Sequence, residues 1–265
     1  MKLIKFKKQK GCTIDCTIDL DLLFETKDEI KKFNGKWKDF IASDPDNKKV
    51  YKKKGAVLKY KSEQLIPIKK DKRPSLLLIL GNPATHSVES EMFFSFEGDR
   101  KEHRFWSRIL KPAGVLDLPF EPGLSIEKLN KQRRDALFNL DYESGFRIGL
   151  SVIISMPSTP GGPWGGIAGV QKLIGAKAMR RLEQAETERM LECAKKFVNP
   201  KGAVIAFQKN AWNNLCSKSN PKYDLKLARA GKLKGHLKGD PGIPLLCVPP
   251  TRLCGPCSRV LKRFL

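Results

Sequence analysis

The chain has 265 residues, and 40% of them are hydrophobic, which is enough for a folded core and too much for general disorder. Its formal net charge of +23 indicates a polyanionic partner, nucleic acid or an anionic membrane surface, although a solvated lysine-rich surface explains part of the excess. No segment approaches the roughly 20 apolar residues of a membrane span, and the lysine-rich start lacks the apolar core of a signal peptide. We therefore expect an intracellular protein, in the cytoplasm, nucleoid or nucleus, with no membrane partner.

Residues 1–70 are rich in lysine, lack arginine and carry few apolar side chains. We interpret them as an N-terminal extension, with a small separate module as the alternative. Apolar residues at helical spacing predict a helix over 27–41, with Thr26 as its N-cap and Glu29 completing a capping box. The polar stretch 44–54 is typical of an exposed loop.

From residue 71 onward, short apolar runs alternate with helical patterns. This alternation predicts an α/β domain over 71–265, built as three α/β/α layers around a mostly parallel sheet of about four strands. The expected strands cover 76–80, 146–155, 203–207 and 244–248. The expected helices cover 102–111, 170–197, 209–217 and a short segment at the C-terminus.

The strand at 76–80 is wholly apolar and runs directly into Gly81-Asn82-Pro83. A short apolar run bounded by turn residues is typical of a buried parallel strand. Open α/β sheets bind ligands at the carboxyl ends of their strands, which places Asn82 where a ligand is expected. The alternative is that Asn-Pro simply forms a turn.

The order of several short motifs resembles the uracil-DNA glycosylase superfamily, and most closely its mismatch-specific uracil/thymine branch. The resemblance covers about residues 75–265. Two departures concern the catalytic mode: Gly81 directly precedes Asn82 where the family leaves one residue between them, and the last loop lacks the histidine of some branches. The matching pieces are Gly81-Asn82-Pro83, Phe94, His103-Arg104-Phe105-Trp106, Ile148-Gly149-Leu150 through Pro157-Ser158-Thr159, Val204-Ile205-Ala206-Phe207 and Val248-Pro249-Pro250-Thr251-Arg252.

The resemblance implies that Asn82 holds the water that attacks the N-glycosidic bond. It also implies that Phe94 stacks on a base flipped out of the helix, with Phe96 as the alternative, because such enzymes read the extruded base between aromatic walls. Either phenylalanine could instead be a core residue. The base pocket would also include Gly81, Pro83 and His86. A carboxylate of Glu89 or Glu91 could act as general base if burial raised its pKa.

The C-terminal region carries the expected DNA-binding surface. Residues 225–265 contain nine lysine or arginine residues and Asp240 as their one acid. A stiff proline-rich loop with Pro250, Thr251 and Arg252 is a candidate wedge for the duplex, or a capped turn before the last helix. The candidates for contacts with DNA phosphates are Arg104, Lys232, Lys234 and Lys238.

Seven cysteines, an odd number, argue against a disulfide framework. Cys254-Gly255-Pro256-Cys257 matches a thioredoxin-type motif, but too few residues follow it to build a thioredoxin domain. A zinc or iron–sulfur site that includes Cys247, Cys254 and Cys257 is a weaker hypothesis than buried free thiols. We therefore predict no metal and no cofactor.

Together these features predict a DNA-repair hydrolase, a monofunctional uracil-DNA glycosylase acting in base excision repair of DNA damage as a monomer. It would be monofunctional because no lysine is placed within the motifs to form a Schiff base. The alternatives are a non-catalytic nucleic-acid-binding protein on the same fold and a thiol- or metal-binding protein.

Overall fold

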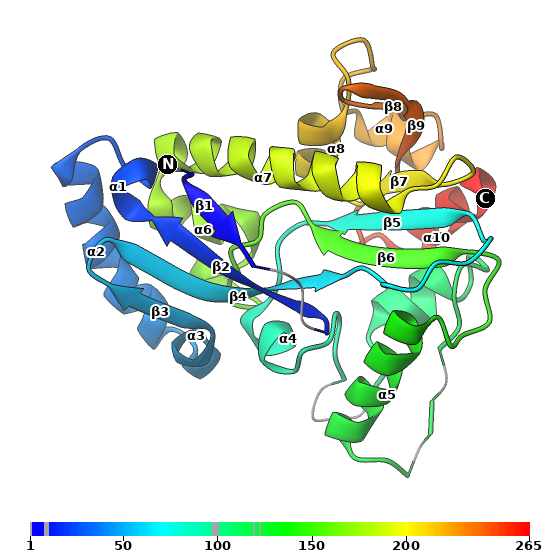
Figure 1. Ribbon diagram of the computed structural model, residues 1–265, viewed down its shortest axis with the longest axis horizontal. Coiled ribbons are helices and arrows are strands. Elements are labelled where there is room, and N and C mark those ends of the chain that lie inside the picture. Colours follow the sequence, from blue (N-terminus) through cyan, green and yellow to red (C-terminus); the bar gives the residue numbers. More distant parts are fainter. Residues whose placement is uncertain (1, 8–10, 97–100, 119, 122) are drawn as a thin grey trace. The chain divides into compact units, whose positions relative to one another are not determined.

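The computed structural model describes residues 2–7, 11–96, 101–118, 120–121 and 123–265 (Figure 1). The chain forms two compact units, and each unit collects three separate stretches of sequence. No helix in these ranges is long and apolar enough to cross a membrane. The first unit comprises Met1–Gln64, Gly81–Phe93 and Val152–Glu188, and the second comprises Leu65–Leu80, Phe94–Ser151 and Arg189–Leu265.

The first unit contains an antiparallel sheet made from the lysine-rich N-terminal residues. Strand β2 pairs with β1 on one side and with β4 on the other, and β3 also pairs with β4. Side chains along β4 alternate between buried and exposed, the pattern of a strand with one face in the core. The strands are β1 (Ile4–Phe6), β2 (Thr13–Asp19), β3 (Tyr51–Lys54) and β4 (Val57–Leu65).

Helix α2 (Lys27–Ala42) follows the short helix α1 (Leu20–Leu23) and confirms the helix predicted over 27–41. The Thr26 hydroxyl accepts a hydrogen bond from the Glu29 N–H at 3.2 Å, as an N-cap does. The Glu29 carboxylate accepts from the N–H of Glu25 at 2.8 Å, one residue before the position that a capping box would give.

The loop predicted over 44–54 is wrong, because this stretch forms α3 (Pro45–Val50) and β3. Asp44 caps the helix by accepting from the Asp46 N–H at 2.9 Å, and a proline occupies the first turn, where it is tolerated. Tyr51 is buried and lies edge-on to Trp37 and Phe40, with ring centroids 5.5 and 5.4 Å away. The few apolar side chains of the stretch thus join an aromatic core and outweigh its polar composition.

The remaining helices of the first unit come from its two later stretches, Gly81–Phe93 and Val152–Glu188. The single helix predicted over 170–197 is two helices, because Gly175 adopts a φ of 85° that ends the first one. Helix α7 continues beyond the limit of the first unit. These elements are α4 (Thr85–Glu89), the 3₁₀ turn η2 (Gly162–Trp164), α6 (Gly166–Ile174) and α7 (Ala176–Phe197).

The second unit has a mostly parallel core with the strand order β6-β5-β7-β9-β8. Strands β5, β7 and β9 run parallel, and β8 closes the edge as an antiparallel hairpin with β9 (Figure 1). All side chains of β5, β6 and β7 are buried, as the apolar runs predict. The strands are β5 (Ser75–Leu80), β6 (Arg147–Val152), β7 (Ala203–Ala206), β8 (Lys234–Leu237) and β9 (Asp240–Cys247).

The mixed α/β class with helices flanking a sheet is confirmed, but the number of strands is wrong. The described residues form nine strands in place of about four. Four of the extra strands lie in the N-terminal region and mix apolar residues with many charged and polar ones, and β8 consists largely of polar or small residues. Neither pattern resembles the wholly apolar runs used to identify strands.

Two helical segments of the second unit differ from expectation. The helix predicted over 102–111 is largely the π-helix η1 (Trp106–Leu110), in which the Lys111 N–H bonds to the Trp106 carbonyl at 3.1 Å. Helix α5 (Ile126–Asn139), capped by Ser125, has no counterpart among the predicted elements. The other helices are α8 (Lys209–Leu215), α9 (Leu225–Arg229) and α10 (Cys254–Phe264).

Candidate functional site

Asn82 lies in the first unit, just after β5, with its side chain held in one orientation. Its Nδ2 donates to the Ser158 hydroxyl at 2.9 Å and to the Met156 carbonyl at 3.3 Å. In the part of the chain that the structure describes, Oδ1 has no hydrogen-bond partner, and the residue is half-buried. The amide thus uses its donors to anchor itself and keeps its acceptor for a small molecule such as water.

The chain around Asn82 runs beside the segment 154–158 as a short parallel extension. The Ser158 N–H donates to the Pro83 carbonyl, and the Thr85 N–H donates to the Ser158 carbonyl, both at 3.0 Å. The Ser158 hydroxyl also accepts from the Gly166 N–H at 2.8 Å, in the first turn of α6. Ser158 therefore links Asn82 to the start of a helix.

Three buried side chains fix the segment 155–158 from its other sides. The Tyr51 hydroxyl donates to the Pro157 carbonyl at 2.5 Å, and the hydroxyls of Tyr60 and Ser155 are 2.8 Å apart. The Glu186 carboxylate accepts from the Ser155 N–H at 2.7 Å. Burial raises the pKa of both tyrosines, so they remain neutral hydrogen-bonding groups.

The neighbouring candidates of the first unit are more exposed. His86 lies on α4, half-buried, with its Nε2 3.4 Å from the Ser87 hydroxyl. Glu89 is exposed, and Glu91 forms a long ion pair of 3.8 Å with Lys61. The general-base hypothesis requires a buried carboxylate, and neither glutamate meets that condition.

Phe94 belongs to the second unit and has aromatic partners of its own. Its ring stacks on His103 with centroids 4.6 Å apart and on Phe105 with centroids 4.2 Å apart. Its carbonyl accepts from the Trp106 indole N–H at 3.0 Å. A flipped base would have to share this ring with the two side chains that already stack on it.

Phe96, the alternative base-stacking residue, is 4% exposed. The guanidinium of Arg133 lies 4.5 Å from the centre of its ring, and Phe120 stacks on it with centroids 5.7 Å apart. The side chain therefore serves as a core residue that supports Phe120, which is 47% exposed.

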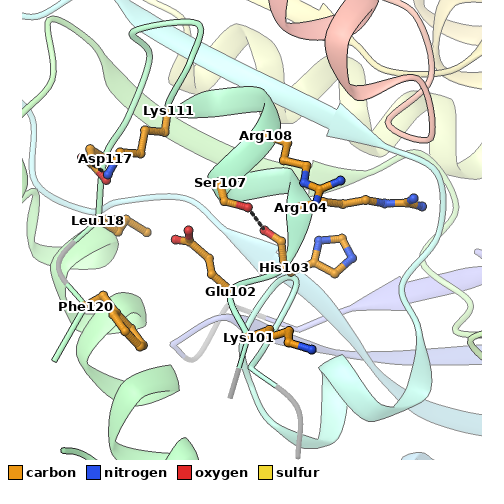
Figure 2. A pocket seen from close by; sticks show the side chains of 10 residues that line it. All are labelled: Lys101, Glu102, His103, Arg104, Ser107, Arg108, Lys111, Asp117, Leu118 and Phe120. Atoms are coloured by element: carbon orange, nitrogen blue, oxygen red, sulfur yellow. Dashed lines mark hydrogen bonds and ion pairs between the residues drawn. The ribbon is translucent and has the colours of Figure 1, made fainter. Parts of the chain in front are cut away.

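An open pocket of about 840 Å³ lies against η1 in the second unit (Figure 2). Cationic side chains dominate one side of it, and Leu118 and Phe120 form its apolar side (Figure 2). The Phe105 N–H donates to Nδ1 of His103 at 3.1 Å. The polar residues that line it are Lys101, Glu102, His103, Arg104, Ser107, Arg108, Lys111 and Asp117.

The proposed wedge follows β9 and turns directly into α10. Pro250 and Thr251 are half-buried, Arg252 is exposed, and the Leu253 N–H closes the turn on the Pro250 carbonyl at 2.8 Å. The Cys254 thiol donates to the Thr251 carbonyl at 3.2 Å. The loop is thus a hydrogen-bonded turn that presents a cation to solvent.

The three candidate lysines near this loop do not form one cluster. Lys234 pairs across the hairpin with Leu246, close to the end of β9, and its Nζ lies 5.0 Å from the centre of the Phe264 ring. Lys232 lies two residues before Lys234, at the same end of the hairpin. Lys238 lies at the opposite end of the hairpin, about 13 Å from Lys234 at the rise of an extended strand.

The cysteines are free thiols. Burial raises the pKa of Cys247 to about 12 and also raises the pKa of Cys257, so both are protonated at neutral pH. Within the ranges that the structure covers, no group of three or more histidine, cysteine or acidic side chains could hold a metal ion.

No protein-family model matches this chain. No curated protein matches its sequence. The roles assigned to Asn82, Phe94 and the C-terminal cations therefore depend on the residues themselves.

The structure brings Gly81, Asn82 and Pro83 together with Ser158, and it gathers Phe94, His103 and Phe105 into a separate cluster of the other unit. Sequence reasoning did not assign roles to Ser158 or Arg108. Ser158 belongs to the motif Pro157-Ser158-Thr159, but the sequence alone gave it no function. Arg108 follows Arg104 by four residues, and this spacing was the available signal.

Proposed function

We propose that this protein hydrolyses the N-glycosidic bond of uracil, or of a related deaminated or mismatched base, in DNA. The observation that carries the proposal is the anchored amide of Asn82, whose Nδ2 is engaged while Oδ1 has no partner within the described residues. A uracil-DNA-glycosylase-like three-layer arrangement and a monomeric state belong to the same proposal.

In this reaction Oδ1 accepts a hydrogen bond from a water and aligns it with the sugar. The water oxygen forms a bond to C1′, the bond from C1′ to the base nitrogen breaks, and the water releases a proton as the base leaves as an anion. A neutral amide orients water but does not remove its proton, so catalysis depends on positioning. Neither Glu89 nor Glu91 is buried enough to be an obvious base, which predicts a slow enzyme.

The DNA surface of this proposal comes from the second unit. Arg252, Lys232 and Lys234 lie at one end of the β8–β9 hairpin, and a second open pocket of about 480 Å³ is lined by Lys209, Lys218 and Lys222. Exposed cations of this kind contact phosphates and position a duplex without reading its sequence.

The test is excision of uracil from an oligonucleotide, detected by alkaline cleavage of the abasic product with enzyme in excess. Asn82→Ala should slow excision at least 100-fold with little change in DNA affinity, because its contact matters mainly in the transition state. Asn139→Ala, an exposed asparagine at the end of α5, is the matched control. If the native protein produces no alkali-cleavable product on U:G, U:A or single-stranded uracil substrates, the proposal is refuted.

A second candidate is a non-catalytic nucleic-acid-binding protein. The stacking of Phe94 on His103 and Phe105 favours it, because that ring already has the partners a base would replace. Such a protein would bind uracil-containing and normal DNA equally and would leave both intact.

A further inference from the structure

The pocket on η1 holds two arginines, and no acidic side chain of the described residues forms an ion pair with either. Arg104 and Arg108 are exposed, and among the described residues neither forms an ion pair. Both guanidinium groups extend to the same side of the helix, near His103 (Figure 2). Like charges four residues apart on a helix repel each other, so this arrangement is stabilised when an anion lies between them.

Among the described residues, Glu102 and Asp117 supply the carboxylates of the pocket, and each forms an ion pair. Asp117 forms an ion pair of 2.8 Å with Lys111. Oε1 of Glu102 pairs at 2.5 Å with the buried guanidinium of Arg133. The positive charge of the two arginines is therefore available to a ligand, and guanidinium groups suit phosphate because they offer paired N–H donors.

The other side of the pocket provides an aromatic surface. Phe120 is 47% exposed, although its ring is supported from beneath by Phe96 and, through that ring, by Arg133. An exposed ring held in place in this way can stack on a flat ligand at small entropic cost. Glu102 lies between this surface and the arginines in Figure 2, and its Oε2 has no partner within the described ranges.

We propose that this pocket binds a nucleotide, with its phosphate between Arg104 and Arg108 and its base stacked on Phe120. Oε2 of Glu102 accepts a hydrogen bond from a sugar hydroxyl. The volume of about 840 Å³ falls within the range of small-molecule sites. The site lies wholly in the second unit and does not depend on catalysis at Asn82 in the first.

The test is isothermal titration calorimetry of the full chain with adenosine 5′-monophosphate, adenosine and inorganic phosphate. The monophosphate should bind at least tenfold more tightly than either fragment, because each fragment occupies half of the site. Equal affinities for the monophosphate and inorganic phosphate would overturn the nucleotide assignment. Absence of binding by the monophosphate and by a single-stranded hexauridylate would overturn the site.

Variants separate the two halves of the pocket. Arg104→Gln/Arg108→Gln should weaken monophosphate binding at least tenfold, whereas Arg180→Gln, an exposed arginine of α7, should leave it unchanged. Phe120→Leu keeps an apolar side chain but removes the ring, and it should weaken the monophosphate while sparing inorganic phosphate. Unchanged binding by the double variant, with a native circular dichroism spectrum, would overturn the proposal.

Competition assigns the source of the nucleotide. Displacement of the monophosphate by hexauridylate, an RNA strand that keeps its 2′-hydroxyls, would support a site for one nucleotide of a strand, and failure to displace it would support a site for a free nucleotide. Asn82→Ala should retain monophosphate binding. Absence of uracil excision by a native protein that binds the monophosphate would therefore refute only the proposed activity at Asn82. Excision by a native protein that does not bind the monophosphate would refute only the nucleotide pocket.

Discussion

Replacing Glu63 by glutamine should make the protein more stable at neutral pH, because the native carboxyl is buried and has no countercharge among the residues that the structure describes. Glu63 lies on β4 opposite Thr13, is 4% exposed, and its Oε1 has no hydrogen-bond partner among the described residues. Burial raises its pKa from 4.5 to about 8. The folded protein therefore holds a proton that the unfolded chain releases at lower pH.

The sign and size of the effect follow from this difference. A carboxyl whose pKa is raised in the folded state contributes its full stability below pH 4.5 and loses it as the pH rises through about 8. Each unit of pKa corresponds to about 1.4 kcal/mol, so the whole change amounts to about 4–5 kcal/mol. Glutamine does not ionise, and the stability of E63Q relative to the native protein should rise by about 1.4 kcal/mol per pH unit between pH 5 and 8.

Urea denaturation followed by circular dichroism at pH 5, 6, 7 and 8 measures this slope. Other carboxyls titrate equally in both proteins and cancel in the difference. Glu143→Gln, at an exposed glutamate of the second unit, is the control and should follow the native protein. A buried glutamine amide adds a constant offset, so the slope decides: a difference between E63Q and native protein that does not vary with pH would refute the reasoning.

Further expectations concern packing and charge. A Cβ on residue 169 would lie 2.1 Å from backbone atoms of Trp164, so Gly169→Ala should lower the free energy of unfolding by about 1–3 kcal/mol. Gly145→Ala, whose Cβ would meet no atom within 4 Å, is the control and should not lower it. Equal urea midpoints for the two variants would contradict the close packing at Gly169. If Lys232 and Lys234 each meet a DNA phosphate, replacing both by glutamine should flatten the log–log salt dependence of duplex binding by about two units. Lys238→Gln, at the far end of the hairpin, should flatten the salt dependence by an amount that adds to that of the Lys232/Lys234 double variant. A salt dependence unchanged in the double variant would mean that Lys232 and Lys234 lie on a solvated surface and do not contact DNA.

The elements found from sequence are those whose local pattern and burial agree. The run at 76–80 is apolar because its strand is buried on both faces, and the periodicity of 27–41 reflects one helix face in the core. The helix at 45–50 was not predicted because it contributes few apolar side chains to the core. Its position depends on aromatic contacts such as that of Tyr51 with Trp37, which lies elsewhere in the sequence. Propensity within such a segment is decided by contacts that lie outside it.

The candidate site was predictable only in its first residue. A polar side chain after a buried strand indicates a ligand position, and that reasoning led to Asn82. Its partner Ser158 lies 76 residues away and becomes visible only when the two segments pair. The pocket on η1 was predicted only in part. Arg104 was expected to contact phosphate, whereas Arg108 and Phe120 were given no role. Phe120 lies 16 residues after Arg104 in the sequence and lines the same pocket only in the folded chain.

The interleaving of the two units sets the order in which the chain can fold during synthesis. The first unit needs residues as late as Glu188, so its N-terminal sheet leaves the ribosome well before the stretch Val152–Glu188 of the same unit has been synthesised. The second unit includes Leu65–Leu80 and extends to Leu265. Strand β5 is therefore synthesised long before β7, with which it pairs, and before β9, which pairs with β7. Because contacts distant in sequence form slowly, the nascent chain exposes apolar strands for longer than a chain of consecutive domains would, and chaperones have a correspondingly wider interval in which to bind it.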